Sequence, residues 1–173
     1  MIIWRGEGRI SLSKQTIDLS FIQGDIGISS SLLKEIDDIR VIGSRVISIE
    51  NLTTFNAYQP KKEFVIYLGG YHNNARREFI KELFRHNPTV QYYHYGDIDA
   101  GGFYILNHLR TKTGVPFAPL HMDVQTLKDN ADKTKELTEN DRKRLANLLD
   151  GEFDEVVRYM LEHNCKFEQE NLD

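Results

Sequence analysis

The chain has 173 residues, with 22 Lys and Arg against 26 Asp and Glu, a formal net charge of -4 and one cysteine. This length suits one well-buried domain with a small appendage, and a single cysteine excludes an intramolecular disulfide. No apolar run is long enough for a membrane span or a signal-peptide core, so we expect a cytoplasmic protein with no membrane partner. The acidic balance excludes a chain coated in positive charge, but it leaves nucleic-acid binding by a local basic cluster open.

The first 44 residues read as a β-rich segment. Residues 1–28 hold short alternating runs broken by glycines, a pattern typical of hairpin strands. A serine among residues 29–31 is expected to cap a short amphipathic helix that ends near Asp38. We interpret residues 1–44 as an edge or a fragment of a preceding domain.

The pattern of apolar residues changes after residue 44. Apolar runs predict short buried strands at residues 46–49, 64–68, 90–93 and 115–118. One amphipathic helix between them ends at Asn87-Pro88, and another runs from the glycines after Asp99 to Gly114. Strands that alternate with helices imply βαβ units, so residues 45–123 are predicted to form an α/β core with a mostly parallel sheet flanked by helices.

Residues 124–173 are predicted to form a charged helical extension. Leu145, Leu148 and Leu149 lie at helical spacing before Gly151, and a second apolar stripe follows over residues 156–161. We expect these two helices to form a hairpin that packs on the α/β core.

Polar residues follow three of the predicted strands: Glu50, the loop at residues 69–73, and Asp97 with Asp99. On an extended strand, residues two apart point to the same side, so the two aspartates should project together into solvent while Ile98 turns toward the core. Two like charges this close repel, and a hard cation such as Mg²⁺ or Mn²⁺ makes the arrangement favourable. If the strands are neighbours, Glu50 converges on the same point. The other interpretation is a strand end whose aspartate caps the next helix.

These motifs resemble a known family. The strand-terminal Glu50, the glycine-bearing strand and the Asp97-x-Asp99 pair followed by glycine are similar to the Toprim domain of topoisomerases, primases and related nucleases. Residues 49–55, 68–72 and 95–102 look closer still to the C-terminal domain of the nuclease subunit of Wadjet anti-plasmid systems, which is related to the A subunit of type VI topoisomerases. The resemblance covers about residues 45–123 and extends weakly to residues 165–170. Full-length members carry an additional N-terminal region, so we expect a catalytic domain alone.

The resemblance implies cleavage of double-stranded DNA in partnership with an SMC-like loop-extruding complex. Glu50, Asp97 and Asp99 would be catalytic and would hold Mg²⁺ or Mn²⁺. Glu168 and Glu170 would complete the metal site from the C-terminus, with a solvated tail as the alternative. The oligomeric state stays open, a homodimer included.

Two further groups are weighed against plainer interpretations. His72 is a catalytic candidate that would orient water or contact phosphate, or else a satisfied surface histidine. The basic residues Arg76, Arg77 and Lys81 share one predicted helix and are candidate DNA-phosphate contacts, or else a solvated helix face.

Three other functions remain in view. The first is a non-catalytic DNA-binding or assembly module, and the second is a domain like that of the type VI topoisomerase A subunit. The third, a phosphotransferase with an aspartyl nucleophile, leaves Glu50 unexplained. Tyr93 and Tyr95 invite comparison with a topoisomerase nucleophile, but in the type VI relatives that tyrosine lies on a separate winged-helix domain, so we expect both to be core residues.

Overall fold

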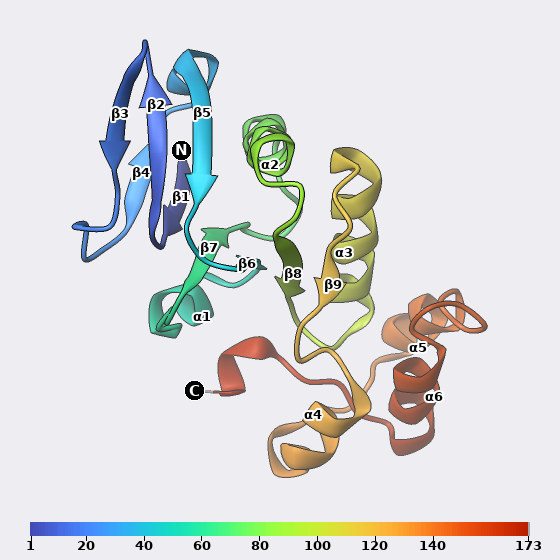
Figure 1. Cartoon of the computed structure of the whole chain (residues 1–173). Helices are drawn as coiled ribbons and strands as arrows, with labels where there is room; N and C mark the ends of the chain where they lie inside the picture. The colour runs from blue at the N-terminus through green and yellow to red at the C-terminus, as the bar shows by residue number, and fades with distance from the viewer. Residues whose placement is uncertain (173) are drawn as a thin grey trace.

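The structure, a computed structural model of the chain, describes residues 1–172, with the side chains of residues 1–170. It is an α/β fold, as predicted, with a mixed, mostly parallel six-stranded sheet and a separate antiparallel sheet of three strands (Figure 1). The strands are β1 (Ile2–Arg5), β2 (Gly8–Leu12), β3 (Gln15–Asp18), β4 (Ile26–Ile28), β5 (Ile36–Val41), β6 (Arg45–Ile49), β7 (Glu63–Tyr67), β8 (Gln91–Tyr95) and β9 (Ala118–Pro119). The helices are α1 (Leu52–Ala57), α2 (Asn74–His86), α3 (Ala100–Thr113), α4 (Val124–Asp129), α5 (Glu139–Ala146) and α6 (Asp154–His163), with 3₁₀ turns η1 (Leu32–Glu35), η2 (Ala131–Lys133) and η3 (Gln169–Leu172).

The large sheet has the order β4-β1-β7-β6-β8-β9. Strand β6 lies at its centre, parallel to β7 on one side and to β8 on the other. Strand β1 pairs antiparallel with β7 and with β4. The carboxyl ends of β6, β7 and β8 therefore meet at one edge of the sheet, which is where ligands gather in open α/β folds.

Alternating side chains cover the two faces of this sheet. Val46 and Ile66 point into a large core with the apolar stripes of α2 and α3, and Ile47 and Val65 point to a smaller cluster around Phe55 of α1. This period-two alternation places helices on both faces of the sheet. No helix of the described residues is long and apolar enough to cross a membrane.

The expected helix near residues 32–38 is wrong in its second half. The turn η1 covers Leu32–Glu35, and the chain then forms β5, which pairs antiparallel with β2. Ile36 and Ile39 are buried by this pairing. Two apolar residues three apart fit a helix stripe as well as one face of a strand with a bulge, so the long-range pairing decided between them.

The strand expected at residues 115–118 is also shifted. Val115 and Phe117 are buried, but only Ala118 and Pro119 form the edge strand β9 beside β8. The strands of residues 1–44 divide between the two sheets, since β1 and β4 extend the large sheet and β2, β3 and β5 form the small one. The domain boundaries at residues 44 and 123 stay predictions.

The expected C-terminal helix pair is present as α5 and α6, which contact each other, although α5 ends at Ala146 and leaves Leu148 and Leu149 in the following turn. Helix α5 begins with a capping box in which the Thr138 hydroxyl accepts from the Asp141 N–H while the Asp141 carboxylate accepts from the Thr138 N–H. Lys166 Nζ lies 2.8 Å from Asp141 Oδ2. Asp141 thus joins the start of α5 to the C-terminal segment.

This junction predicts a measurable acid sensitivity. Burial opposes ionisation of Asp141, but the Lys166 ammonium and the Thr138 donors outweigh it and lower the pKa of Asp141 to about 2. Because the folded pKa lies below its ordinary value, the ionised group stabilises the fold at neutral pH, and this contribution is lost as the pH falls from about 4 toward 2. We expect Asp141→Asn to lower the unfolding free energy by about 2 kcal/mol at pH 7 and by progressively less as the pH falls below 4. Urea unfolding at pH 7, 4 and 3 measures this, with Asp132→Asn as an exposed control, and a pH-independent difference would contradict it.

Candidate metal and nucleic-acid site

The parallel strands bring the predicted carboxylates to one edge of the sheet. Glu50 directly follows β6, and Asp97 lies two residues beyond β8. The Glu50 N–H donates to the Tyr95 carbonyl, which holds the two strand ends together. Since β7 flanks β6 on its other side, the loop that carries His72 leaves from the same edge.

Glu50 is poorly hydrated for a carboxylate. Its side chain is 15% exposed, and among the described residues its Oε2 atom has no hydrogen-bond partner. Burial, followed by the charges of Asp97 and Asp99, raises the pKa of Glu50 to about 8. A buried carboxylate beside two others is the electrostatic arrangement that a divalent cation relieves.

Asp97 and Asp99 are half-buried, whereas the sequence predicted that both project into solvent. Ile98 between them is buried, as predicted. Asp99 is the N-cap of α3, and its Oδ1 accepts from the Gly102 N–H at 2.7 Å. The capping interpretation is therefore confirmed for Asp99, although its second carboxylate oxygen is not used by that cap.

The C-terminal segment approaches Asp97 directly. The Gln169 N–H donates to Asp97 Oδ1 at 2.7 Å, and the Gln169 side-chain oxygen accepts from the Asn51 N–H at 3.3 Å. Burial raises the pKa of Asp97 to about 6, opposed by the Gln169 N–H and assisted by the charges of Asp99, Glu168 and Glu170. Gln169 thus connects the loop after β6 to the loop after β8.

Glu168 and Glu170 of this segment lie beside the site, and both are engaged by other residues. Glu168 pairs with Lys135, and the exposed Glu170 accepts from the Asn51 amide at 3.3 Å. Their neighbours do not form a solvated tail, because Cys165, Phe167 and Gln169 are buried and Phe167 pairs with Ile98, although Glu170 itself is exposed. The metal-ligand role of Glu168 and Glu170 stays a prediction.

The sequence interpretation missed two buried residues at this edge, Gln169 and His94. His94 is fully buried on β8, its Nδ1 lies 2.9 Å from Ser48 Oγ, and its Nε2 lies 3.9 Å from Glu50 Oε2. The only signal in the sequence was one polar ring in an aromatic strand just before the two aspartates. For Gln169 the sequence signal was weaker, since it is only a glutamine between two glutamates.

His72 is buried, so its interpretation as a surface histidine is wrong. It is 3% exposed, and its Nε2 lies 3.3 Å from Nδ1 of His108 on α3. Burial, then the charges of His108, Arg77 and Arg76, lower the pKa of His72 to about 4. His72 is therefore neutral at physiological pH, and a direct role as a cation for phosphate does not fit it.

The basic residues on α2 differ in their surroundings. The Arg76 guanidinium lies 5.3 Å from the centre of the Tyr67 ring, at the carboxyl end of β7. Arg77 reaches the His72 carbonyl at 3.5 Å, and Lys81 is paired with Glu78 at 2.9 Å. Arg76 and Arg77 lie in the first turn of α2 and Lys81 lies further along it, so the first two are the better placed toward the carboxylates.

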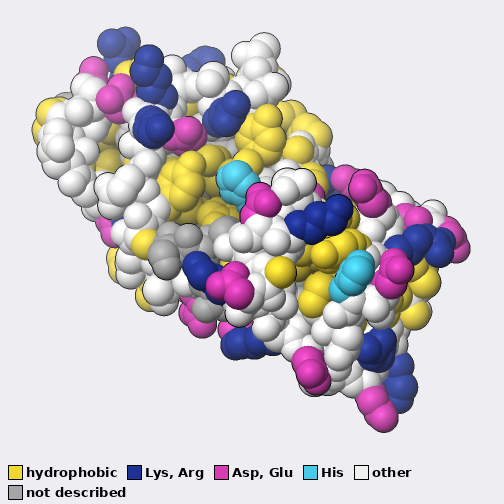
Figure 2. Space-filling model, turned by 90° about the horizontal axis from the view of Figure 1, so that it is seen from below, with side chains coloured by type: hydrophobic (Ala, Val, Ile, Leu, Met, Phe, Trp, Pro, Cys, Tyr) yellow, Lys and Arg dark blue, Asp and Glu magenta, His cyan; other side chains and the backbone are white. Residues whose placement is uncertain are grey.

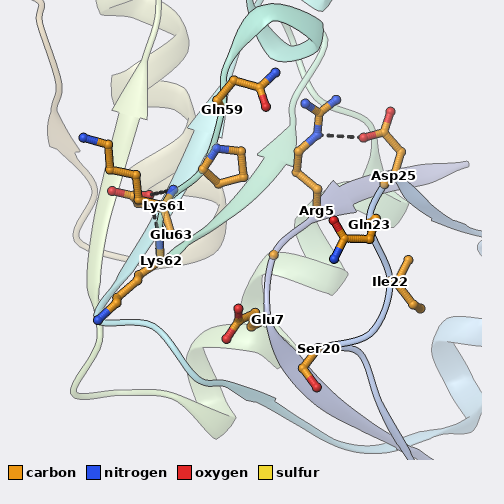
Figure 3. A pocket seen from close by; sticks show the side chains of 13 residues that line it. Arg5, Glu7, Ser20, Ile22, Gln23, Asp25, Gln59, Lys61, Lys62 and Glu63 are labelled. Atoms are coloured by element: carbon orange, nitrogen blue, oxygen red, sulfur yellow. Dashed lines mark hydrogen bonds and ion pairs between the residues drawn. The ribbon is translucent and has the colours of Figure 1, made fainter.

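Tyr93 and Tyr95 pack with the smaller hydrophobic cluster around Phe55, as expected for core residues. A cavity of 480 Å³ lies elsewhere, lined by Ser20 and by residues 5–7, 22–25 and 59–63 (Figure 3). Arg5 and Asp25 pair at 2.7 Å beside it, and none of the predicted site residues lines it. Figure 2 shows acidic and basic side chains interspersed on the face around the C-terminal end.

The side chains at this edge are of a kind that binds metal ions, but their present arrangement does not form a metal site in the described part of the chain. Three carboxylates gather at one edge, but no group of three or more His, Cys, Asp and Glu side chains that could hold a metal ion is formed among the described residues. One oxygen of Asp97 and one of Asp99 are engaged by backbone N–H groups. Metal binding would therefore require the carboxylates to move closer together, with the Glu50 carboxylate and the second oxygens of the two aspartates as the ligands.

Comparisons with known proteins give one family. A family model described as Wadjet protein JetD, C-terminal, matches residues 8–173. The Wadjet protein JetD of Bacillus cereus (strain Q1) is 28% identical over 174 residues, a match that covers 96% of this chain. The chain spans 42% of the length of that relative.

Proposed function

Because this chain belongs to the Wadjet JetD C-terminal family, we propose that it is a metal-dependent endonuclease domain of the Toprim type, acting in an anti-plasmid defence system. Its substrate would be double-stranded DNA, and its partner an SMC-like complex. The observation that carries the proposal is that Glu50, Asp97 and Asp99 lie together at the carboxyl edge of the parallel strands, with the side chain of Glu50 only 15% exposed and its pKa raised. Structural carboxylates are more often paired with cations than gathered with one another.

The three carboxylates fit Mg²⁺ or Mn²⁺ in their chemistry. They offer hard oxygen ligands, and Glu50 Oε2 is a buried atom without a hydrogen-bond partner among the described residues. Glu50, Asp97 and Asp99 would hold the metal, with Glu168 and Glu170 adding negative charge beside Asp97. When bound, such a metal polarises a phosphate, activates water and stabilises a leaving oxygen.

The surrounding residues would prepare this edge for the metal. Gln169 fixes one oxygen of Asp97 and leaves the other available, and the α3 cap does the same for Asp99. The small exposed fraction of the Glu50 side chain keeps water from competing with the metal for this carboxylate. These contacts orient the carboxylates before a substrate arrives, which reduces the cost of ordering them during the reaction.

The test is a pair of metal titrations on the purified chain. Supercoiled plasmid DNA is incubated with the protein in Mg²⁺ or Mn²⁺, with EDTA as the metal-free control, and thermal melts are recorded over the same metal concentrations. We expect nicked or linear DNA only with metal, and a melting temperature that rises with metal because the ion binds the folded state. No cleavage and no metal-dependent shift, in the chain and in the assembled complex, would overturn the proposal.

A non-catalytic DNA-binding or assembly module is the second candidate. It is favoured by the lack of a preformed group of metal-ligating side chains within the described part of the chain. It predicts DNA binding without cleavage in either metal and in either setting. A domain like the type VI topoisomerase A subunit instead predicts a protein-DNA covalent adduct, which gel electrophoresis under denaturing conditions detects.

The basic residues of α2 give a separate prediction. We expect the double change Arg76→Gln and Arg77→Gln to weaken binding to all DNA sequences alike, because these side chains would contact phosphates. The slope of log affinity against log salt should fall by about 1 for each phosphate that the variant no longer neutralises. Lys81→Gln should have a smaller effect, since Lys81 is already paired with Glu78.

Fluorescence anisotropy over a salt series measures both quantities. Arg85→Gln, on the same helix but paired with Glu82, is the matched control. If the isolated chain binds weakly, the comparison belongs in the assembled complex. If the salt slope in the assembled complex is unchanged, Arg76 and Arg77 do not contact DNA and belong to an ordinary solvated helix face.

A further inference from the structure

Ser48 and His94 form a buried polar pair inside an otherwise apolar sheet. Both side chains are 0% exposed, and they lie opposite each other where β6 pairs with β8. His94 Nδ1 is 2.9 Å from Ser48 Oγ, so one ring nitrogen is satisfied. Burying a polar pair in a core costs free energy that two apolar residues would not, so this pair needs a reason beyond packing.

The other ring nitrogen faces Glu50. His94 Nε2 lies 3.9 Å from Glu50 Oε2, too far for a hydrogen bond, and neither atom has a partner within the described residues. Two buried polar atoms left unsatisfied side by side are each costly. A small rotation of the Glu50 side chain would bring them into hydrogen-bond range and satisfy both.

Gly96 keeps the space between them free. A Cβ at this position would lie 2.7 Å from His94 Nε2 and 2.8 Å from Glu50 Oε2, closer than real contacts allow. His94 Nε2 and Glu50 Oε2 thus both approach the backbone at Gly96, because glycine has no side chain to exclude them. Any larger residue at position 96 would push the imidazole and the carboxylate apart.

We propose that His94 is a positioning residue that orients Glu50, an inference that rests on the proposed function. His94 donates its Nε2–H to Glu50 Oε2. The Ser48 hydroxyl lies 3.4 Å from the Tyr93 carbonyl and 2.9 Å from His94 Nδ1, and in this proposal it donates to the nearer acceptor, Nδ1, and so fixes the ring in that tautomer. The bond leaves the other oxygen of Glu50 for the metal. A hydrogen bond to a metal-ligating carboxylate fixes the orientation of that carboxylate. The loss of such a bond commonly lowers metal affinity by about 10- to 100-fold.

Alternative roles for His94 fit less well. A catalytic role through contact with DNA is excluded by its complete burial. A purely structural role would need only the Ser48 hydrogen bond, and it gives no reason for Nε2 to meet Glu50 over a glycine. Positioning accounts for all three features of the pair.

The first test reads the tautomer directly. Long-range ¹H–¹⁵N spectra of the purified, metal-free chain distinguish Nε2–H from Nδ1–H in a neutral histidine. We expect Nε2–H for His94, a ring signal that shifts in Glu50→Gln, and a mixture of tautomers in Ser48→Ala. An Nδ1–H tautomer, or a His94 signal insensitive to Glu50→Gln, would overturn the proposal whether or not the protein cleaves DNA.

The second test separates positioning from folding. Gly96→Ala leaves both partners intact but inserts a methyl group between them, and Gly24→Ala, where a Cβ meets nothing within 4 Å, is the matched control. We expect Gly96→Ala and His94→Leu to raise the Mn²⁺ concentration for half-maximal thermal shift by about tenfold. His94→Gln, which keeps a donor, should recover part of this loss.

The outcomes of the second test distinguish the two proposals. Wild-type metal affinity in both Gly96→Ala and His94→Leu would refute the positioning role while leaving the metal site intact. If the wild-type chain itself shows no metal response, the proposed function fails, and the tautomer measurement still decides whether His94 and Glu50 are bonded. If the His94→Leu variant does not fold, the metal affinity of Gly96→Ala decides the question.

Discussion

Replacing Asp97 with asparagine is expected to reduce metal-dependent DNA cleavage by about a hundredfold or more while the fold is retained. Asparagine has the same shape, and its side-chain oxygen can still accept the Gln169 N–H that now donates to Asp97 Oδ1. The change removes a charge that helps to raise the pKa of Glu50. The metal-free protein should therefore melt at the same temperature or slightly higher, because like-charge repulsion is relieved.

Plasmid nicking in Mg²⁺ and thermal melts in EDTA measure the two effects together, and Asp132→Asn on the exposed surface is the charge-matched control. Asp99 needs a different design because it caps α3. Asp99→Asn preserves a good cap, whereas Asp99→Ala adds a loss of about 1 kcal/mol of stability. Wild-type cleavage by Asp97→Asn would contradict the prediction, and a large drop in its metal-free melting temperature would assign Asp97 a structural role.

Gly102→Ala is expected to destabilise the protein by about 3 kcal/mol. A Cβ on Gly102 would lie 2.1 Å from the Asp97 carbonyl oxygen and 3.1 Å from the Asp97 nitrogen. These are backbone atoms, so the start of α3 and the loop that carries Asp97 would have to separate. Alanine favours a helix over glycine by only about 1 kcal/mol, which is too little to offset the clash.

Urea unfolding of Gly102→Ala measures this, and Gly24→Ala serves as the control because it changes glycine to alanine in open space. We also expect the variant to lose cleavage activity, since Asp97 and Asp99 flank the displaced backbone. An unfolding free energy within about 0.5 kcal/mol of the wild type would contradict the close approach of α3 to this loop.

Several elements were predictable because their signals are local. The apolar runs that became β6, β7 and β8, and the stripes that became α2 and α3, follow periodicities that one segment displays by itself. The alternation of strand and helix was enough to predict a parallel sheet, and therefore a common edge for Glu50 and Asp97. The Asp97-Ile98-Asp99 alternation also predicted correctly that Ile98 is buried.

Other features depended on contacts between distant segments. The pairing of β5 with β2 turned an apparent helix into a strand, and β1 joined the large sheet beside β7. Burial of His72 depends on α3, which supplies His108 from 36 residues away. None of these partners can be read from the segment itself, because the free energy that selects the conformation comes from the pairing.

For the site, the sequence by itself determined which carboxylates are available and that parallel strands would bring them to one edge. Only the tertiary structure decided how each is held: Gln169 reaches Asp97 across 72 residues, and Ser48 and His94 meet beneath Glu50 because β6 is the neighbour of β8. A residue's type and spacing fix its chemistry and its side of a strand, since both follow from covalent geometry. Its desolvation and its hydrogen-bond partners follow from which segments pack together, and these set the charge and the direction of the groups at this edge.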